Sequence, residues 1–231
     1  MRIALVADLH GNRPATERLE QDLKFRGADR IWCLGDAVGK GPDSVYTCDW
    51  VKSNCEVVLR GNWDEGVAFQ RFPKDVYYWK QLGEKRMSWL SQLPLEHRCL
   101  FSGNRIRLFH GRPVMERMLW PQYEYQEWKP YFDQKTDTVI YADSHKQGLR
   151  LLGEGKRIVN TGSVGNGTGI NQVQYCLMEG EADSPSPAPL IFMFPMLPYD
   201  NERAALDAEA ETDLPGGEAY IREIRTGIYS R

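Results

Sequence analysis

The stretch Met1-Arg-Ile-Ala-Leu-Val-Ala-Asp8-Leu-His10 opens the chain and decides how the rest is interpreted. Its unbroken apolar run, residues 3–7, is typical of a strand that is buried on both faces of a parallel sheet. Asp8 and His10 follow the point where that strand should end, and both are good metal ligands. In open α/β sheets, ligands bind beyond the carboxyl ends of the strands. The stretch therefore predicts a ligand or metal site, provided that later strands end in the same way.

The composition excludes several classes of protein. A chain of 231 residues with 42% hydrophobic and 26% charged residues is typical of one globular domain. Its net charge of −3 argues against a nucleic-acid duplex or an anionic membrane as a partner bound through general electrostatics. The sequence has neither an apolar run of about 18 residues nor the features of a signal peptide, so we expect a cytoplasmic protein. The five cysteines form no Cys-x-x-Cys pair, which predicts reduced thiols.

Two further strands also end in polar side chains. An amphipathic helix over residues 14–26 leads to a strand over 30–34, which runs into Gly35-Asp36. A second helix over 42–54 leads to a strand over 56–59, which is followed by Asn62. Alternation of strand and helix with short connections predicts a parallel sheet with right-handed crossovers. The carboxyl ends of parallel strands share one edge, so these side chains should lie close together.

The second half of the chain predicts a second group of strands. A hairpin over 97–101 and 105–109 ends in His110, and a strand over 138–141 precedes Asp143 and His145. Two more strand pairs are expected, 149–152 with 157–159 and 172–178 with 190–196. Residues 67–93 and 112–133 are expected to be helical insertions, with the first as a cap over the site. A helix over 201–212 and an arginine-rich tail with Arg222, Arg225 and Arg231 complete the chain.

These blocks, in this order, resemble the calcineurin-like metallophosphoesterases. The blocks are Asp8-x-His10, Gly35-Asp36-x-x-Gly39, Gly61-Asn62, His110-Gly111 and Asp143-x-His145. Within that superfamily, the Gly61-Asn62-Trp63 variant and the stretch Asn160-x-Gly-Ser-Val-Gly165 resemble the bacterial branch that includes asymmetric diadenosine tetraphosphate hydrolases. The resemblance implies an α/β fold, the four-layer α/β/β/α metallophosphoesterase sandwich, in a single domain of residues 1–231.

The resemblance also implies a site with two divalent transition metals, Mn²⁺, Fe or Zn²⁺. The implied ligands are Asp8, His10 and His145 for the first metal, Asn62, His110 and Asp143 for the second, and Asp36 as the bridge between the two. Asp36, Asn62 and His110 would take part directly in catalysis. In such a site two metals lower the pKa of a bridging water, and the resulting hydroxide attacks phosphorus.

The sequence departs from the family pattern at two positions. The last block is usually Gly-His-x-His, whereas this chain has Ala142-Asp143-Ser144-His145, so a carboxylate replaces an imidazole. Asp143 as a ligand would favour harder ions such as Mn²⁺; alternatively, the second site is poorly occupied and activity is weak. Trp63 stands where many relatives have a histidine that protonates the leaving group. Its presence favours substrates whose leaving groups are already good, such as phosphoanhydrides and aryl esters.

Three residues near the blocks are candidates for substrate binding, namely Trp63, Arg60 and Arg112. Trp63 would stack on a nucleobase and the arginines would hold phosphates, but core packing and solvated surface charge are the ordinary roles of such residues. We expect a small phosphorylated or nucleotide substrate, with no nucleic-acid duplex or membrane as a partner. Three functions compete: a nucleoside or dinucleoside polyphosphate hydrolase, a general phosphodiesterase, and a catalytically weakened binding or regulatory protein.

Overall fold

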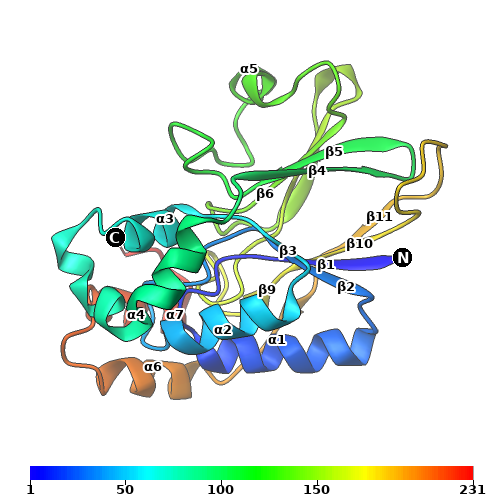
Figure 1. Ribbon diagram of the computed structural model, residues 1–231. Helices are drawn as coiled ribbons and strands as arrows, with labels where there is room; N and C mark the ends of the chain where they lie inside the picture. The colour runs from blue at the N-terminus through cyan, green and yellow to red at the C-terminus, as the bar shows by residue number, and fades with distance from the viewer. Residues whose placement is uncertain (231) are drawn as a thin grey trace.

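Two five-stranded sheets form the framework of residues 1–230, which the computed structural model describes (Figure 1). The first sheet has the order β11-β10-β1-β2-β3. Its strands are β1 (Arg2–Val6), β2 (Arg30–Cys33), β3 (Val57–Val58), β10 (Cys176–Glu179) and β11 (Ile191–Met193). As predicted, β1, β2 and β3 are parallel, while β10 and β11 are antiparallel to their neighbours.

Strand β1 is apolar on both faces because both faces are covered. Ile3 and Leu5 point into the core between the two sheets, whereas Ala4 and Val6 point toward the helices. This alternation follows from the two-residue period of a strand. The buried run in the sequence therefore reports a central strand, and its carboxyl end is the place where Asp8 leaves the sheet.

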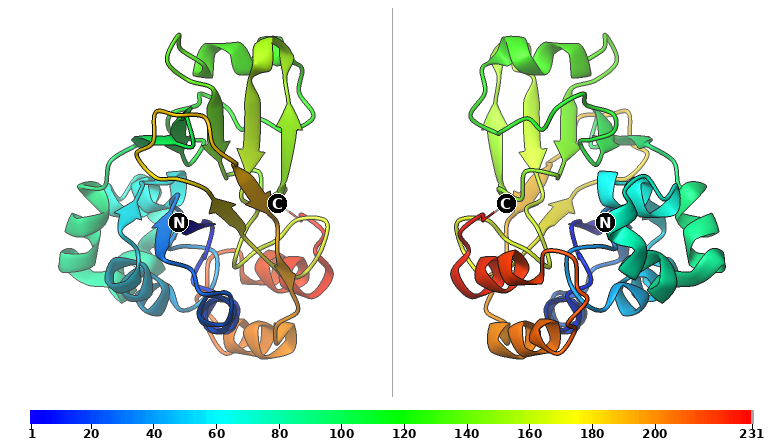
Figure 2. Two further views of the ribbon diagram at one scale, coloured as in Figure 1. Left: turned by 90° about the vertical axis from the view of Figure 1, so that its right-hand side faces the viewer. Right: turned by 90° about the vertical axis from the view of Figure 1, so that its left-hand side faces the viewer.

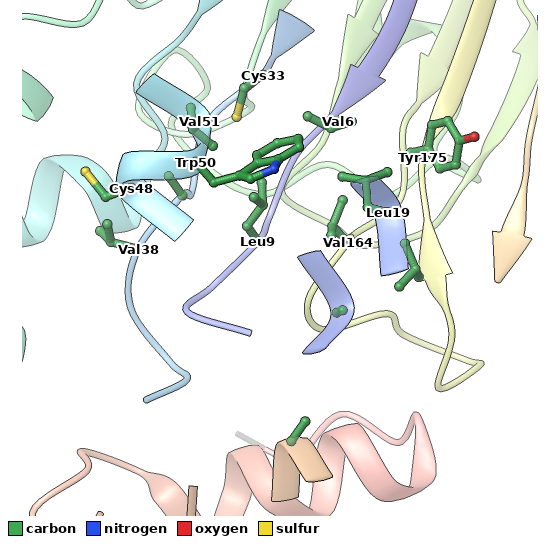
Figure 3. Close-up of a cluster of buried hydrophobic side chains, with 14 of the residues drawn as sticks. Val6, Leu9, Leu19, Cys33, Val38, Cys48, Trp50, Val51, Val164 and Tyr175 are labelled. Atoms are coloured by element: carbon green, nitrogen blue, oxygen red, sulfur yellow. The ribbon is translucent and has the colours of Figure 1, made fainter. Parts of the chain in front are cut away.

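A layer of helices covers the outer face of the first sheet (Figure 1). It contains α1 (Arg13–Arg26), α2 (Ser44–Asn54), α3 (Asn62–Ala68), α4 (Val76–Ser91) after the short η1 (Pro73–Asp75), α6 (Asn201–Glu209) and α7 (Gly217–Thr226). Helix α1 begins where Asn12 Oδ1 accepts from the backbone N of Ala15 and ends at Gly27 in a left-handed conformation. Figure 3 shows the apolar core beneath this layer, where Leu19 and Trp50 pack near Val6.

The second sheet has the order β4-β5-β6-β8-β7 and faces the first. Its strands are β4 (Glu96–Phe101), β5 (Asn104–Phe109), β6 (Thr138–Tyr141), β7 (Gly148–Leu151) and β8 (Arg157–Asn160), with η3 (Gly153–Gly155) joining the last two. A separate two-stranded sheet pairs β9 (Val173–Gln174) with β12 (Met196–Leu197). Leu108, Ile140 and Val159 of the second sheet pack against Leu5 and Trp32 of the first. The four-layer prediction is confirmed.

The predicted insertion over residues 67–93 is helical as expected, whereas the one over residues 112–133 differs from the expectation. Helix α4 packs beside α2 and buries Tyr78 and Leu82 in the core of the helical layer. It therefore extends that layer; only the turn before it lies beside the candidate site. The 112–133 segment is mostly irregular, with one short helix, α5 (Tyr125–Trp128), and a single turn, η2 (Lys129–Tyr131). The segment runs along the outer face of the second sheet (Figure 2). Its large side chains, among them Met115 and Trp128, pack singly against Val139, Tyr141 and Ile158 of that face.

The predicted arginine-rich tail is largely helical. Arg222 and Arg225 lie on α7, whose buried Tyr220 and Ile224 pack in the helical layer. Arg225 forms ion pairs with Glu202 and Glu209 of α6 at 2.6 and 2.8 Å. Arg231 lies outside the described residues. Within residues 1–230, no helix is both long and apolar enough to span a bilayer.

Candidate metal centre

The predicted ligands come together because each follows a strand at the edge where the two sheets meet. Asp8 and His10 follow β1, Asp36 follows β2, His110 follows β5 and His145 follows β6. All five side chains are buried. The two sheets thus contribute to one site, and residues more than 130 positions apart become neighbours.

The backbone at these positions is unusual. Positive φ angles occur at residues that carry the predicted ligands: Asp8 (56°), His10 (48°), Asp36 (54°), Asp143 (61°) and His145 (55°). Left-handed conformations are uncommon for residues other than glycine, although Asp and His tolerate them better than most. Such backbone strain concentrates at functional sites, where the surrounding structure holds it in place. The repeated conformation turns each side chain inward as the strand ends.

Asp8 lies at the centre of the cluster. Its Oδ1 is 3.1 Å from Nε2 of His145, 3.4 Å from Nε2 of His10 and 3.8 Å from Nε2 of His110. The Oδ2 of Asp36 lies 3.3 Å from Nε2 of His110 and 3.8 Å from Nε2 of His10. Two groups of potential ligands result, Asp8-His10-His145 and Asp8-Asp36-His110, and Asp8 belongs to both.

The three imidazoles share one orientation. In each ring, Nδ1 faces a backbone carbonyl, and Nε2 faces the carboxylates. The contacts are His10 with Val38 (3.3 Å), His110 with Leu34 (3.0 Å) and His145 with Asn166 (2.6 Å). A carbonyl accepts the Nδ1 proton of a neutral imidazole and leaves the Nε2 lone pair available for a metal. This arrangement is typical of histidine ligands.

Several buried polar atoms in the cluster have no hydrogen-bond partner within residues 1–230. They are both carboxylate oxygens of Asp8, Oδ1 of Asn62 and Nε2 of His110. An unpaired buried polar group costs about 1–3 kcal/mol, so several at one place call for a physical reason. Oxygen and imidazole donors suit Mn²⁺, Fe or Zn²⁺. The donor set therefore fits divalent metal ions, as the sequence predicts.

The charges of the cluster also favour a cation. Burial would raise the pKa of Asp8, but the imidazoles of His145 and His110 outweigh it and hold that pKa well below its usual range. Burial likewise opposes ionisation of Asp36, yet His110 keeps its pKa low. Burial lowers the pKa of His10 to about 4, with Lys40 adding to the effect. Burial would lower the pKa of His110, but Asp36 and Asp8 raise it to about 10. Two buried carboxylates thus remain ionised beside an imidazolium, and a bound metal cation would take the place of its Nε2 proton.

The loop before α3 positions Asp36. The Oδ1 of Asp36 accepts from the backbone N of Trp63 at 2.8 Å, and a Cβ at Gly61 would lie 2.1 Å from the same oxygen. Only glycine permits this approach. Asp64, which sequence reasoning missed, accepts from the backbone N of Asp36 at 2.7 Å and of Gly61 at 3.0 Å. Its position three residues after Gly61, where a capping carboxylate is common, was the available signal.

Asn166 is the second residue that sequence reasoning missed. Its backbone oxygen accepts from Nδ1 of His145, and its side chain lies between Lys40 and Glu223. Lys40 Nζ donates to Oδ1 of Asn166 at 3.0 Å, and Nδ2 of Asn166 donates to Oε2 of Glu223 at 3.2 Å. Helix α7 thereby supports a candidate metal ligand from outside the motif-bearing strands. No local sequence pattern signals this contact.

Asp143 lies beside the cluster but belongs to neither ligand group. Both of its oxygens face Arg112: Nη2 donates to Oδ1 at 2.6 Å, and Nε donates to Oδ2 at 2.9 Å. The guanidinium forms a bidentate pair with this carboxylate. The role of Asp143 as a ligand of the second metal, together with Asn62 and His110, therefore stays a prediction.

Two pockets adjoin the cluster and share Asn62, Trp63 and Arg112. The pocket over the ligands has a volume of about 170 Å³ and is also lined by Asp36 and His145. The adjoining pocket has a volume of about 500 Å³, and its further lining residues include Arg71, Phe72, Lys74 and Met115. Two of the three predicted substrate-binding residues, Trp63 and Arg112, thus line the site.

Arg60, the third predicted substrate-binding residue, is engaged elsewhere. Its Nη1 donates to the carbonyl of Ser91 at 2.6 Å, and its Nε lies 3.2 Å from the buried Glu65. The guanidinium also packs over the ring of Phe69. Arg60 lines neither of the two pockets. These contacts join β3 to the end of α4, so the residue stabilises the loop that carries Asn62.

Comparison with known proteins identifies one sequence relative and two solved structures of similar fold. The protein MJ0912 of Methanocaldococcus jannaschii is 28% identical over 202 residues, which cover 77% of this chain and 82% of the relative. The structure of PH1004 from Pyrococcus horikoshii is 20% identical with a TM-score of 0.78, and that of a metallophosphoesterase from Sphaerobacter thermophilus is 21% identical with a TM-score of 0.75. Both comparisons cover 99% of each chain.

A family model decides the classification. The model of the calcineurin-like phosphoesterase superfamily domain matches residues 1–183, which include β1 to β10 and all the ligands in the two groups. Helices α6 and α7 lie beyond the matched region, and the two archaeal and bacterial structures nevertheless align over them. The chain belongs to the calcineurin-like phosphoesterase superfamily.

Proposed function

We propose that this protein is a metal-dependent hydrolase of phosphate esters or anhydrides, with a nucleoside or dinucleoside polyphosphate as its substrate. One observation carries the proposal: Asp8, Asn62 and His110 have buried ligand atoms that make no hydrogen bond within residues 1–230, and they belong to a cluster whose Asp36, Asn62 and His145 line a pocket. Asp8, His10 and His145 would hold one divalent ion, and Asp36, Asn62 and His110 would hold a second together with Asp8. When bound, such ions supply Lewis acidity toward a water molecule and the phosphoryl oxygens.

The adjoining pocket supports a substrate larger than phosphate. At about 500 Å³ it is of the size that small-molecule sites usually have. Trp63 and Phe72 offer aromatic faces to a nucleobase. Arg112 and Lys74 offer positive charge to phosphates, and Lys74 forms no ion pair within residues 1–230. This mixture of aromatic and cationic side chains matches a nucleotide better than a simple sugar phosphate.

The side chains around the cleft indicate which leaving groups the site favours. The remaining histidine of the chain, His97, packs against Trp32 between the sheets, so it is not available at the site. No imidazole stands at position 63, and the other three histidines are in the ligand cluster. The chain thus lacks an obvious general acid, which favours anhydrides and aryl esters over alkyl esters.

A direct comparison of substrates tests the proposal. Protein loaded with Mn²⁺ should hydrolyse diadenosine tetraphosphate with a kcat/KM at least about tenfold above that for bis(p-nitrophenyl) phosphate, because only the dinucleotide fills the larger pocket. Metal-free protein should be inactive toward both. A preference for the aryl diester would instead identify a general phosphodiesterase. Structural relatives include a candidate diadenosine tetraphosphatase (TM-score 0.55, 19% identity) and an archaeal phosphodiesterase (TM-score 0.53, 12% identity).

A weakened binding or regulatory protein is the second candidate, and one observation favours it. Asp143, the expected seventh ligand, is bound by Arg112 and not by the cluster. The fold is similar to that of Vps29 from Chaetomium thermophilum, with 16% identity and a TM-score of 0.51, which leaves this candidate open without favouring it. Metal content and turnover separate the candidates: metal bound without hydrolysis of any phosphate ester or anhydride would select the second. A cytoplasmic location, and the absence of duplex and membrane partners, stay predictions.

A further inference from the structure

The Arg112–Asp143 pair is built more firmly than a surface ion pair. Asp143 accepts hydrogen bonds from three donor atoms of Arg112. They are Nη2 and Nε of the guanidinium and, at 3.2 Å, the backbone N. The Asp143 side chain is only 3% exposed. Gly111 permits this contact, since a Cβ there would lie 2.5 Å from the Cβ of Asp143. The guanidinium is therefore fixed in direction as well as in place.

The fixed guanidinium stands at the junction of the two pockets. Arg112 lines both, together with Asn62 and Trp63. Its side chain is 40% exposed, and its Nη1 makes no hydrogen bond within residues 1–230. One edge of the planar group thus binds Asp143, and the remaining N–H donors are available to a ligand. An anion that reaches from the metal ligands into the larger pocket must pass this residue.

Because Asp143 is paired with Arg112, its use as a metal ligand would cost free energy. The pairing uses both of its oxygens, so a metal would have to displace a charge-assisted bidentate contact from a nearly buried carboxylate. The two ligand groups, of three residues each, do not include it. The carboxylate is paired instead with Arg112, which faces the cleft.

We propose that Asp143 is the positioning residue that anchors Arg112, and that Arg112 binds a phosphate oxygen of the substrate where the two pockets meet. This assignment rests on the proposed function for the identity of the substrate, but it concerns the phosphate group itself. The arginine lets a polyphosphate bridge the ligand cluster and the larger pocket. Asp143 then contributes to anion binding indirectly, and not to metal binding.

The chain supplies a matched control. Arg105 and Asp137 form the same arrangement at the start of β5 and β6, with Nη2 to Oδ1 at 2.6 Å, Nε to Oδ2 at 2.8 Å and the backbone N to Oδ2 at 3.0 Å. This second pair lines neither of the two pockets. Removal of either pair deletes similar hydrogen bonds, but only the Arg112 pair should affect an anion at the site.

The experiment measures binding of Mn²⁺, and then of inorganic phosphate to the Mn²⁺-loaded protein, by calorimetric titration. Arg112→Met and Asp143→Ala should each weaken phosphate binding by at least about tenfold, and the double variant should be no weaker than Arg112→Met. Arg112→Lys should restore part of the affinity. Arg105→Met and Asp137→Ala should stay within about twofold of the wild type. The Mn²⁺ stoichiometry should be the same in all variants, and circular dichroism verifies that each is folded.

Two results would overturn the assignment. Loss of one Mn²⁺ per chain in Asp143→Ala would make Asp143 a ligand, and wild-type phosphate affinity in Arg112→Met would remove the anion site. Failure of the proposed function is distinguishable. If phosphate binding depends on Arg112 but no phosphate ester or anhydride is hydrolysed, the assignment stands and the hydrolase proposal falls. If hydrolysis is rapid and substitution of Arg112 does not change it, the hydrolase proposal stands and the assignment of Arg112 falls.

Discussion

At the scale of single residues, Asp36 is the predicted ligand that contacts both the imidazoles and the start of α3. Its Oδ2 faces His110 and His10, and its Oδ1 accepts from the backbone N of Trp63. Asp36→Asn keeps the shape but removes the charge, so turnover should fall at least about hundredfold, because the second ion loses an anionic ligand oxygen. Steady-state hydrolysis of the best substrate measures this effect. Activity above about a tenth of the wild-type value would contradict a two-metal mechanism.

Trp63 is the residue at which leaving-group preference should change. Its ring stands edge-on to His10 at 6.0 Å and lines both pockets, so a histidine there would lie beside the reacting group. Trp63→His should raise kcat for alkyl phosphate esters by about tenfold or more and change anhydride hydrolysis little, because only poor leaving groups need a proton donor. Trp63→Phe serves as the control. Equal changes on both substrates would contradict this role.

The residues of the site were predictable to different degrees. Asp8, Asp36 and His110 were predictable because each directly follows an apolar strand, and strand ends in a parallel arrangement converge. The pairing of Asp143 with Arg112 was not, since the two are 31 positions apart and no local pattern encodes their contact. The contacts of Arg60 were not predictable either, because its partner Glu65 lies on a helix whose direction the sequence does not give.

At the scale of elements, the strands were predicted better than the insertions. Residues 138–141 form β6 as expected, because an apolar run bounded by polar residues has few alternatives. The 112–133 segment has helix-forming residues but also Pro113, Pro121 and Pro130, and it follows the outer face of the second sheet instead of forming a regular helix. Burial of single large side chains, such as Trp128, outweighed local helix propensity there.

The start of β6 gives a prediction about pH. Asp137 accepts a bidentate contact from Arg105, which lowers its pKa from 3.8 to about 2. A carboxyl group with a lowered folded-state pKa stabilises the protein above its unfolded pKa, and the effect disappears as the pH falls through the folded value. Asp137→Asn should therefore lower the free energy of unfolding modestly at pH 7, and the difference should shrink between about pH 4 and pH 2.

Urea unfolding at several pH values measures that difference. Asp207→Asn provides the control, since Asp207 is exposed on α6 and forms no ion pair within residues 1–230. The difference in the free energy of unfolding between Asp207→Asn and the wild type should vary little from pH 7 to pH 2. A constant deficit of Asp137→Asn from pH 7 to pH 2 would mean that the carboxylate charge is not what stabilises the start of this strand.

At the scale of the whole molecule, the candidate metal centre brings together residues from both sheets. Asp8 and Asp36 leave the first sheet, His110 and His145 leave the second, and α7 supports His145 through Asn166. A ligand that binds only the folded state stabilises it by mass action, about 2.7 kcal/mol at a concentration 100 times its Kd. For a domain of this size that corresponds to a rise in Tm of roughly 5–10 °C.

Thermal unfolding with and without Mn²⁺ tests this link independently of catalysis. Wild-type protein stripped with a chelator should melt lower and regain its Tm when Mn²⁺ is added, because the ion binds ligands from both sheets only when the two are packed together. Asp36→Asn should show a smaller rise, since it removes one of the buried carboxylates that hold the ion. Glu223→Gln should weaken Mn²⁺ binding by about tenfold, as expected when a supporting contact of a histidine ligand is disturbed. An identical Tm with and without Mn²⁺ in the wild type would mean that the cluster does not bind the ion in the folded protein.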